Sequence, residues 1–207
     1  MAKRNMWPVV VAAGALVLFL LGYVVGTAGQ SAALDAPGSS SPEAGFSRSM
    51  QLHHNQGVEL ALMARDRSED ETFRVIAYDM AVTQAQQSGQ MYGWLAAWGV
   101  PQYSPDDPMA WMEVVSPEHD HFAGDPNAPM PGMATREEIA VLEEAAGVEA
   151  EVIFLQMMIE HHKGALDMSE AVLALSDHPT VTMLAQAILD SQAIEITLME
   201  AMLAERT

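Results

Sequence analysis

Apolar residues recur every three or four positions through two stretches of the chain, residues 43–98 and 149–205. This spacing places them on one face of an α-helix. Turn residues near the middle of each stretch divide it into two helices, so each stretch predicts a helical hairpin. Because a hairpin cannot bury its apolar face alone, we expect an all-α fold in which the two hairpins pack as a four-helix bundle.

Capping residues mark where the predicted helices begin. Ser40 or Ser41 suits the N-cap of the first helix, and Ser68, three residues before Glu71, has the spacing of a capping box at the start of the second. Pro179 suits the first turn of the last helix, where its missing N–H costs little. The loops inside the hairpins are therefore expected to be only a few residues long.

The second hairpin repeats the first at a constant offset of 108 residues. Residues 46–95, aligned with 154–203 without a gap, share eleven identities. Among them are Phe46/Phe154, Met50/Met158, His53/His161, His54/His162, Gln84/Gln192 and Met91/Met199. A Met-x-x-His-His motif that occurs twice in phase with the following helix indicates an internal duplication. A duplication suggests a pseudo-two-fold axis, which could bring the two histidine pairs together.

The repeated motif has the composition of a soft metal site. Met158 lies three and four residues before His161 and His162, so the three side chains share one helix face. Thioether sulfur and imidazole nitrogen suit copper far better than magnesium or calcium. In the alternative interpretation, the methionines fill gaps in the core and the histidines are ordinary hydrogen-bonded residues. Adjacent helical residues point about 100° apart, so we expect only one histidine of each pair to point fully inward, while the other could face a groove, the crossover or solvent.

The two motifs resemble a known family. Phe-x-x-x-Met-(Ile/Leu)-x-His-His, followed by a helix with Gln-x-x-Glu-Ile-x-x-Met, resembles the domain-of-unknown-function 305 family over about residues 45–205. This resemblance implies a ferritin-like helical protein, often exported, in a family of which several members are connected with copper binding. In the second repeat, Gln192, Glu195 and Met199 match the pattern. In the first, Gln87 replaces the glutamate.

A long crossover, residues 99–134, separates the hairpins. It contains seven prolines, which rule out a continuous helix. The candidate ligands in this crossover are His119, His121, Met130 and Met133. They could capture metal from an exposed loop, or the crossover could cover the side of the bundle with its methionines and Trp111. A capping box at Thr135 then predicts a short helix over residues 135–146.

The N-terminus has a different character. Lys3 and Arg4 precede an uncharged run over residues 7–25, which would span roughly 28 Å as a helix. We expect residues 1–25 to be a transmembrane anchor with the rest of the chain outside the cytoplasm. A cleaved signal peptide is the alternative, and it would give a secreted protein.

A flexible linker is expected to follow the anchor. Residues 26–42 are rich in Gly, Ala, Ser and Pro and predict a tether. Residues 43–207 would then form the folded domain. Its helical repeats are expected at 43–98 and 149–205.

Composition excludes several functions. Nine Lys and Arg face twenty-eight Asp and Glu, and a net charge of −19 argues against binding nucleic acid while it attracts cations. The chain has no cysteine, which excludes disulfides and thiolate zinc sites. Neither histidine pair belongs to a Glu-x-x-His motif of di-iron proteins, and His-Glu-x-x-His is absent. We assign no catalytic residue.

The sequence thus predicts an exported copper-binding protein that serves sequestration, delivery or resistance. We expect copper as Cu(I) or Cu(II). The predicted helical ligands are Met50, His53, His54, Met157, Met158, His161, His162, Met168, Glu195 and Met199. A second copy or a copper-transfer protein is a possible partner. The competing interpretation is a membrane-anchored helical scaffold or interaction module without a metal.

Overall fold

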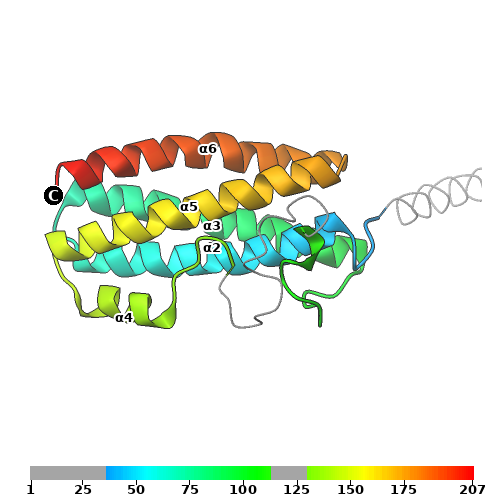
Figure 1. Cartoon of the computed structure of the whole chain (residues 1–207), viewed down its shortest axis with the longest axis horizontal. Coiled ribbons are helices and arrows are strands. Elements are labelled where there is room, and N and C mark those ends of the chain that lie inside the picture. Colours follow the sequence, from blue (N-terminus) through cyan, green and yellow to red (C-terminus); the bar gives the residue numbers. More distant parts are fainter. Residues whose placement is uncertain (1–35, 113–129) are drawn as a thin grey trace, which may run out of the picture. The chain divides into compact units, whose positions relative to one another are not determined.

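The computed structural model describes residues 36–112 and 130–207, and in these ranges its secondary structure is entirely helical (Figure 1). The predicted N-terminal helix, most of the linker, His119 and His121 lie outside the described residues. The elements are α2 (Pro42–Arg67), α3 (Glu71–Trp98), the 3₁₀ turn η1 (Ala110–Met112), α4 (Arg136–Glu144), α5 (Val148–Leu175) and α6 (Pro179–Ala204). In the two described ranges we find no helix with the length and apolarity needed to cross a bilayer. All the elements belong to one compact unit, Gly38–Thr207.

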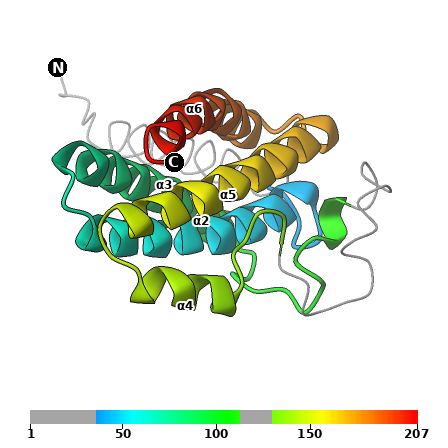
Figure 2. The same cartoon turned by 60° about the vertical axis from the view of Figure 1, so that its left-hand side comes forward.

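The long helices form two hairpins, as the periodicity predicts. α2 packs against α3, α5 packs against α6, and the hairpins meet through α2 and α5 (Figures 1 and 2). The short helix α4 lies against α2 and α5 (Figure 2). The connections inside the hairpins, residues 68–70 and 176–178, are short. Asp70 caps the start of α3, whereas α6 begins at Pro179 without a side-chain cap.

Most of the predicted caps are confirmed. Ser41 accepts a hydrogen bond from the N–H of Ala44, Thr135 and Glu138 form the expected capping box, and Pro179 opens α6. Two boundaries differ. α4 ends at Glu144 instead of residue 146. The N-cap of α3 is Asp70, not Ser68.

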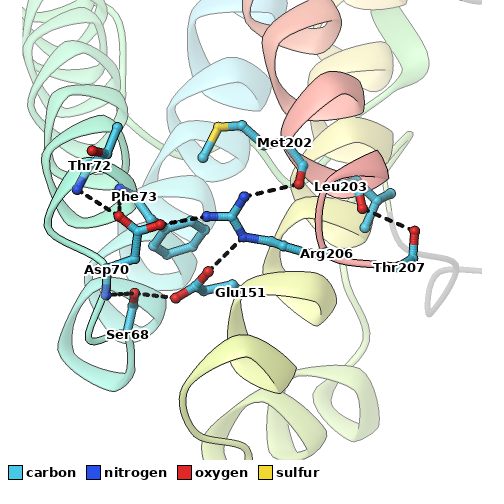
Figure 3. Close-up of polar contacts among 9 residues, drawn as sticks. All are labelled: Ser68, Asp70, Thr72, Phe73, Glu151, Met202, Leu203, Arg206 and Thr207. Carbon is cyan, nitrogen blue, oxygen red and sulfur yellow. Dashed lines mark hydrogen bonds and ion pairs between the residues drawn. The ribbon is translucent and has the colours of Figure 1, made fainter.

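Ser68 has another role, shown in Figure 3. Its hydroxyl donates to Glu151 at 2.5 Å, while Asp70 accepts from the first N–H groups of α3. The carboxylate of Asp70 directly precedes the helix and satisfies two of those groups, so it displaces Ser68 from the cap. Arg206 completes the network by donating to Glu151 at 2.6 Å and to Asp70 at 2.9 Å. This network ties the end of α6 to the starts of α3 and α5.

The apolar core is divided into two clusters. The Phe154 cluster lies around Leu60, Phe73, Leu142, Phe154, Met158 and Met199. The Phe46 cluster lies around Phe46, Met50, Met91, Met130, Met168 and Ile188. Each long helix contributes to both clusters.

Polar residues separate these clusters on every long helix. They are His53 and His54 on α2, Gln84 and Gln87 on α3, His161 and His162 on α5, and Gln192 and Glu195 on α6. We call these eight residues the histidine layer. On α2, for example, the layer lies between Met50 of one cluster and Leu60 of the other. The duplication therefore produces a polar layer across the middle of an apolar core.

Candidate metal centre

All four histidines of the two motifs are fully buried. His53, His54, His161 and His162 each have 0% of their surface exposed. Of the three surroundings expected for the second histidine of each pair, solvent is excluded, and His53 contacts the crossover at Pro131. Three segments cover the rings beyond their own helices: α3, α6 and the crossover.

His53 and His161, the first histidines of the two motifs, meet at the interface between the hairpins. The rings of His53 and His161 lie with centroids 3.7 Å apart and planes inclined by 30°. Nε2 of His161 donates to the backbone carbonyl of His53 at 2.8 Å, and Nε2 of His53 donates to the carbonyl of Pro131 at 3.0 Å. The first contact joins α5 to α2, and the second joins α2 to the crossover.

His54 and His162, the second histidines of the two motifs, make equivalent contacts in the two repeats. Nε2 of His54 contacts Oε1 of Gln87 at 2.7 Å, and Nε2 of His162 contacts Oε2 of Glu195 at 2.6 Å. Both partners lie 33 positions after their histidine, so the two contacts are equivalent at the offset of 108. They differ in charge, because an amide in the first repeat stands where the second has a carboxylate.

These contacts determine the tautomer of every ring. Carbonyl and carboxylate oxygens accept hydrogen bonds, so Nε2 carries the hydrogen in all four histidines. In a neutral ring, Nδ1 is then the nitrogen with the free lone pair. Within the described part of the chain, none of the four Nδ1 atoms has a hydrogen-bond partner, and neither do Oε1 of Gln84 and Gln192. Such a group of unsatisfied buried acceptors is unusual in a protein core.

Burial keeps the imidazoles of His53, His54 and His161 neutral. It lowers the pKa of His54 to about 4 and that of His161 to about 3, and it lowers the pKa of His53 well below its usual value. Neighbouring histidines lower these pKa values further, because a second positive charge nearby would be repelled. At neutral pH these three side chains are therefore in the form that binds metals.

The structure places the two motif methionines on opposite sides of the layer. Met50 belongs to the Phe46 cluster and Met158 to the Phe154 cluster, and both are fully buried. Sδ of Met158 accepts from Nε2 of Gln84 at 3.9 Å, which links this thioether to the layer.

The other predicted methionine ligands lie in apolar surroundings. Met168 is buried in the Phe46 cluster, Met199 is buried in the Phe154 cluster, and Met157 packs against the latter. Among residues 36–112 and 130–207, no three His, Cys, Asp or Glu side chains are grouped so that they could hold a metal ion. A site in this part of the chain would thus need thioether sulfur or a shift of side chains.

The described end of the crossover covers the layer. Met130 is buried in the Phe46 cluster, and Met133 packs against it. Between them, Pro131 and Gly132 approach α5 so closely that a side chain at Gly164 would collide with the Pro131 backbone. Gly132 also has a φ of 73°, which favours glycine. This packing matches the interpretation in which crossover methionines cover the helices.

Sequence reasoning missed two groups at this centre. The amides of Gln84 and Gln192 are buried in the layer. Because the two repeats have the same residue at this position, the alignment could have indicated that these amides belong to the centre. The carbonyl of Pro131 had no comparable signal, because any residue could supply it.

Comparisons with known proteins agree with this architecture. A structure of a presumed secreted DUF305 protein from Streptomyces coelicolor is 42% identical, with a TM-score of 0.73, over 82% of this chain and 96% of that one. A DUF305 fragment from Deinococcus radiodurans is 35% identical, with a TM-score of 0.63, over 79% and 96% of the two chains.

More distant structures share the fold alone. CopM in its Cu(II)-bound form is 20% identical, with a TM-score of 0.58, over 81% of this chain and 98% of that one. No curated protein matches the sequence. The model of the family described as domain of unknown function (DUF305) matches residues 43–203, and the chain therefore belongs to the DUF305 family.

Proposed function

We propose that this protein binds copper outside the cytoplasm and serves copper sequestration, delivery or resistance. The observation that carries the proposal is the histidine layer, in which four buried rings donate through Nε2 and keep Nδ1 free. A bound cation would give these lone pairs the partner they lack, and at neutral pH His53, His54 and His161 have no proton to lose before it binds.

The donor set favours copper over harder metals. Neutral imidazole nitrogen is available from both repeats, and Met50 and Met158 supply thioether sulfur at the edges of the layer. Cu(I) accepts these soft ligands, and Cu(II) would rely more on imidazole together with the carboxylate of Glu195. Magnesium and calcium need several oxygen ligands, of which the layer offers one carboxylate and the side-chain amides.

Glu195 is the member of the layer that reaches solvent. Its side chain is 28% exposed, whereas the histidine it contacts is fully buried. A carboxylate at this position would attract cations, in a protein whose net charge of −19 already concentrates them at its surface. We therefore place the route of metal entry beside α6.

Related structures support both copper as the metal and a location outside the cytoplasm. Solved structures with the same fold include CopM in Cu(I)-bound, Cu(II)-bound and silver-bound forms. The presumed secretion of the Streptomyces relative supports an exported domain. We propose that residues 1–25 anchor or export the chain, that 26–42 form the tether, and that 43–207 form a ferritin-like four-helix bundle.

The test is a titration of the full chain in mild detergent with Cu(I), Cu(II), Zn(II) and Fe(II) against a competing chelator. The double variant His161→Ala/His162→Ala should bind copper at least about 10-fold more weakly than the parent chain. His178→Ala is the matched control, because His178 precedes α6 outside the repeated motif. Helicity measured by circular dichroism confirms folding. Equal losses in the two variants, or no preference for copper, would contradict the proposal.

A further inference from the structure

A cavity of about 400 Å³ lies between α2, the end of α3 and the first part of the crossover. This volume is within the range of pockets that bind small molecules. On α2, the residues that line it recur with the period of a helix and therefore share one face. They are Gly45, Arg48, Ser49, Leu52 and Asn55.

The cavity is separate from the histidine layer. Leu52 and Asn55 line it and are exposed, whereas His53 and His54, which lie between them in the sequence, are fully buried in the core. The cavity and the layer are therefore on opposite faces of α2.

Aromatic side chains form much of the wall, and Trp111 is the most firmly held of them. Its Nε1 donates to Oγ of Ser49 at 3.2 Å. A Cβ at Gly45 would lie 2.5 Å from Cγ of Trp111, so this glycine makes room for the indole against α2. Tyr92 and Tyr103 also line the cavity. Such a wall suits an apolar or aromatic ligand body, and aromatic faces also attract cations.

One lining residue offers a hydrogen-bond acceptor without a donor. Nε2 of Gln102 donates to the backbone carbonyl of Tyr92 at 3.1 Å, and this contact sets the orientation of the amide. Its Oε1 is buried and, among the described residues, has no hydrogen-bond partner. Because buried acceptors are normally paired, this oxygen calls for a ligand that carries an N–H or O–H group.

Charge decides between these two kinds of donor. The guanidinium of Arg48 makes four hydrogen bonds to oxygens of Ser39 and Pro101, so most of its N–H groups are already used. Partial burial lowers the pKa of Arg48, and the nearby carboxylate of Asp106 opposes this shift. Asp107 is a second lining carboxylate, and it makes no ion pair within the part of the chain that the structure describes. The lining thus has one negative charge in excess, in a protein that carries −19.

We propose that this cavity binds a small organic ammonium ion. Its N–H groups would donate to Oε1 of Gln102, its charge would be balanced by Asp107, and its apolar part would lie against Trp111. A neutral alcohol could satisfy the amide oxygen but leaves the excess charge, and a carboxylate would add to that charge.

Three probes of similar shape test the charge: 2-phenylethylammonium, 2-phenylethanol and 3-phenylpropanoate. In ¹H–¹⁵N spectra of the full chain in mild detergent, the ammonium ion should shift the indole N–H of Trp111 and the side-chain amide of Gln102. It should bind at least about 10-fold more tightly than the carboxylate. An alcohol or carboxylate that binds as tightly as the ammonium ion would overturn the proposal. The absence of these shifts at about 10 mM ammonium ion would overturn it as well.

Asp107→Asn tests the carboxylate. The variant keeps an oxygen for the hydrogen bond that Asp107 accepts from the N–H of Met109, but it removes the charge. Binding of 2-phenylethylammonium should weaken about 10-fold, and binding of 2-phenylethanol should not change. Asp79→Asn is the matched control, at an exposed position of α3 outside the cavity. Equal affinities for the ammonium ion in the two variants would contradict the role of Asp107.

Gln102→Leu removes the unpaired acceptor and should weaken binding of both the ammonium ion and the alcohol. Gln186→Leu, at an exposed position of α6, should leave both unchanged. The copper-site variant His161→Ala/His162→Ala should bind the ammonium ion as the parent chain does, because the layer lies on the other face of α2. Loss of ammonium binding in that variant, with helicity retained, would place the ion in the layer and overturn the proposal.

Discussion

The imidazole of His161 lies against that of His53 at a centroid distance of 3.7 Å, and its Nε2 donates to the His53 backbone. The two residues occupy the same position in the two repeats, so the duplication has brought equivalent histidines together at the centre of the domain. The carbonyl of His53 sets the tautomer of His161, and the carbonyl of Pro131 sets that of His53. Each ring therefore keeps its Nδ1 lone pair free.

Removing the carboxylate of the layer should weaken copper binding. Glu195→Gln keeps a hydrogen-bond acceptor for His162 but removes a negative charge beside it. We expect Cu(II) affinity to fall by about 10-fold or more, the usual effect of changing a group that orients a metal ligand. The measurement is a competition titration of the variant against the parent chain.

Glu200→Gln is the matched control, because it makes the same change at an exposed position of the same helix. The reciprocal variant Gln87→Glu gives the first repeat the carboxylate of the second and should raise Cu(II) affinity. Identical affinities for Glu195→Gln and Glu200→Gln would exclude a role for Glu195 beyond its general charge.

The metal-free protein should lose stability as the pH falls below about 6.5. The unfolded chain binds protons on its histidines near that pH, while His54 and His161 stay neutral in the folded state down to about 4 and about 3. Their contribution is fully present above pH 6.5 and is lost progressively as the pH falls toward the lower values. Each histidine that stays neutral in the folded state lowers the free energy of unfolding at pH 5 by about 2 kcal/mol relative to its value at pH 7.

Urea denaturation at pH 7, 6 and 5 measures this loss. The interval lies above the pH at which most carboxylates titrate, so histidine dominates it. His54→Gln removes one of these histidines, so the free energy of unfolding should fall less between pH 7 and pH 5. An unfolding free energy that is constant from pH 7 to pH 5 would mean that the layer does not hold its histidines neutral.

Most of the layer follows from the sequence, and the remainder depends on contacts that no local pattern reveals. The offset that aligns His53 with His161 also aligns Gln87 with Glu195, so the duplication explains why the contacts of His54 and His162 are equivalent, although the sequence analysis did not predict these contacts. Full burial of all four histidines could not be predicted, because helical periodicity describes one helix while burial depends on what packs around it. The carbonyl of Pro131 is a backbone group and carries no sequence signal. His119 and His121, outside the described residues, stay predictions.

Breaking the buried ion pair at the end of α6 should be costly. Arg206→Leu leaves the carboxylate of Glu151, which is 3% exposed, without its cation. Loss of one partner from a buried pair typically costs about 3 to 5 kcal/mol. Thermal or urea unfolding measures the change.

Lys163→Leu is the control for this prediction. Its ion pair with Glu160 has the same kind of contact, at 2.7 Å, but both side chains are more than half exposed. Such a pair contributes about 1 kcal/mol or less. Similar losses in Arg206→Leu and Lys163→Leu would show that burial of Glu151 is not what makes the network important.

Adding a methyl group at Gly164 should displace the crossover from the layer. The new Cβ would overlap the backbone of Pro131, whose carbonyl accepts from His53. We expect Gly164→Ala to cost about 1 to 3 kcal/mol, as overpacking does. Gly93→Ala, at a helical glycine with open space around it, should instead stabilise the protein by up to about 1 kcal/mol. Equal stabilities would indicate that the crossover does not press on α5.

The most direct test of the copper proposal is long-range ¹H–¹⁵N correlation spectroscopy of the imidazole rings, with and without Cu(I), which is diamagnetic. In the metal-free protein, His53, His54, His161 and His162 should all appear as Nε2–H tautomers. Cu(I) should then shift Nδ1 resonances within this set of four. Shifts confined to His119, His121 or His178, with the buried rings unchanged, would contradict the assignment of the histidine layer as the copper site.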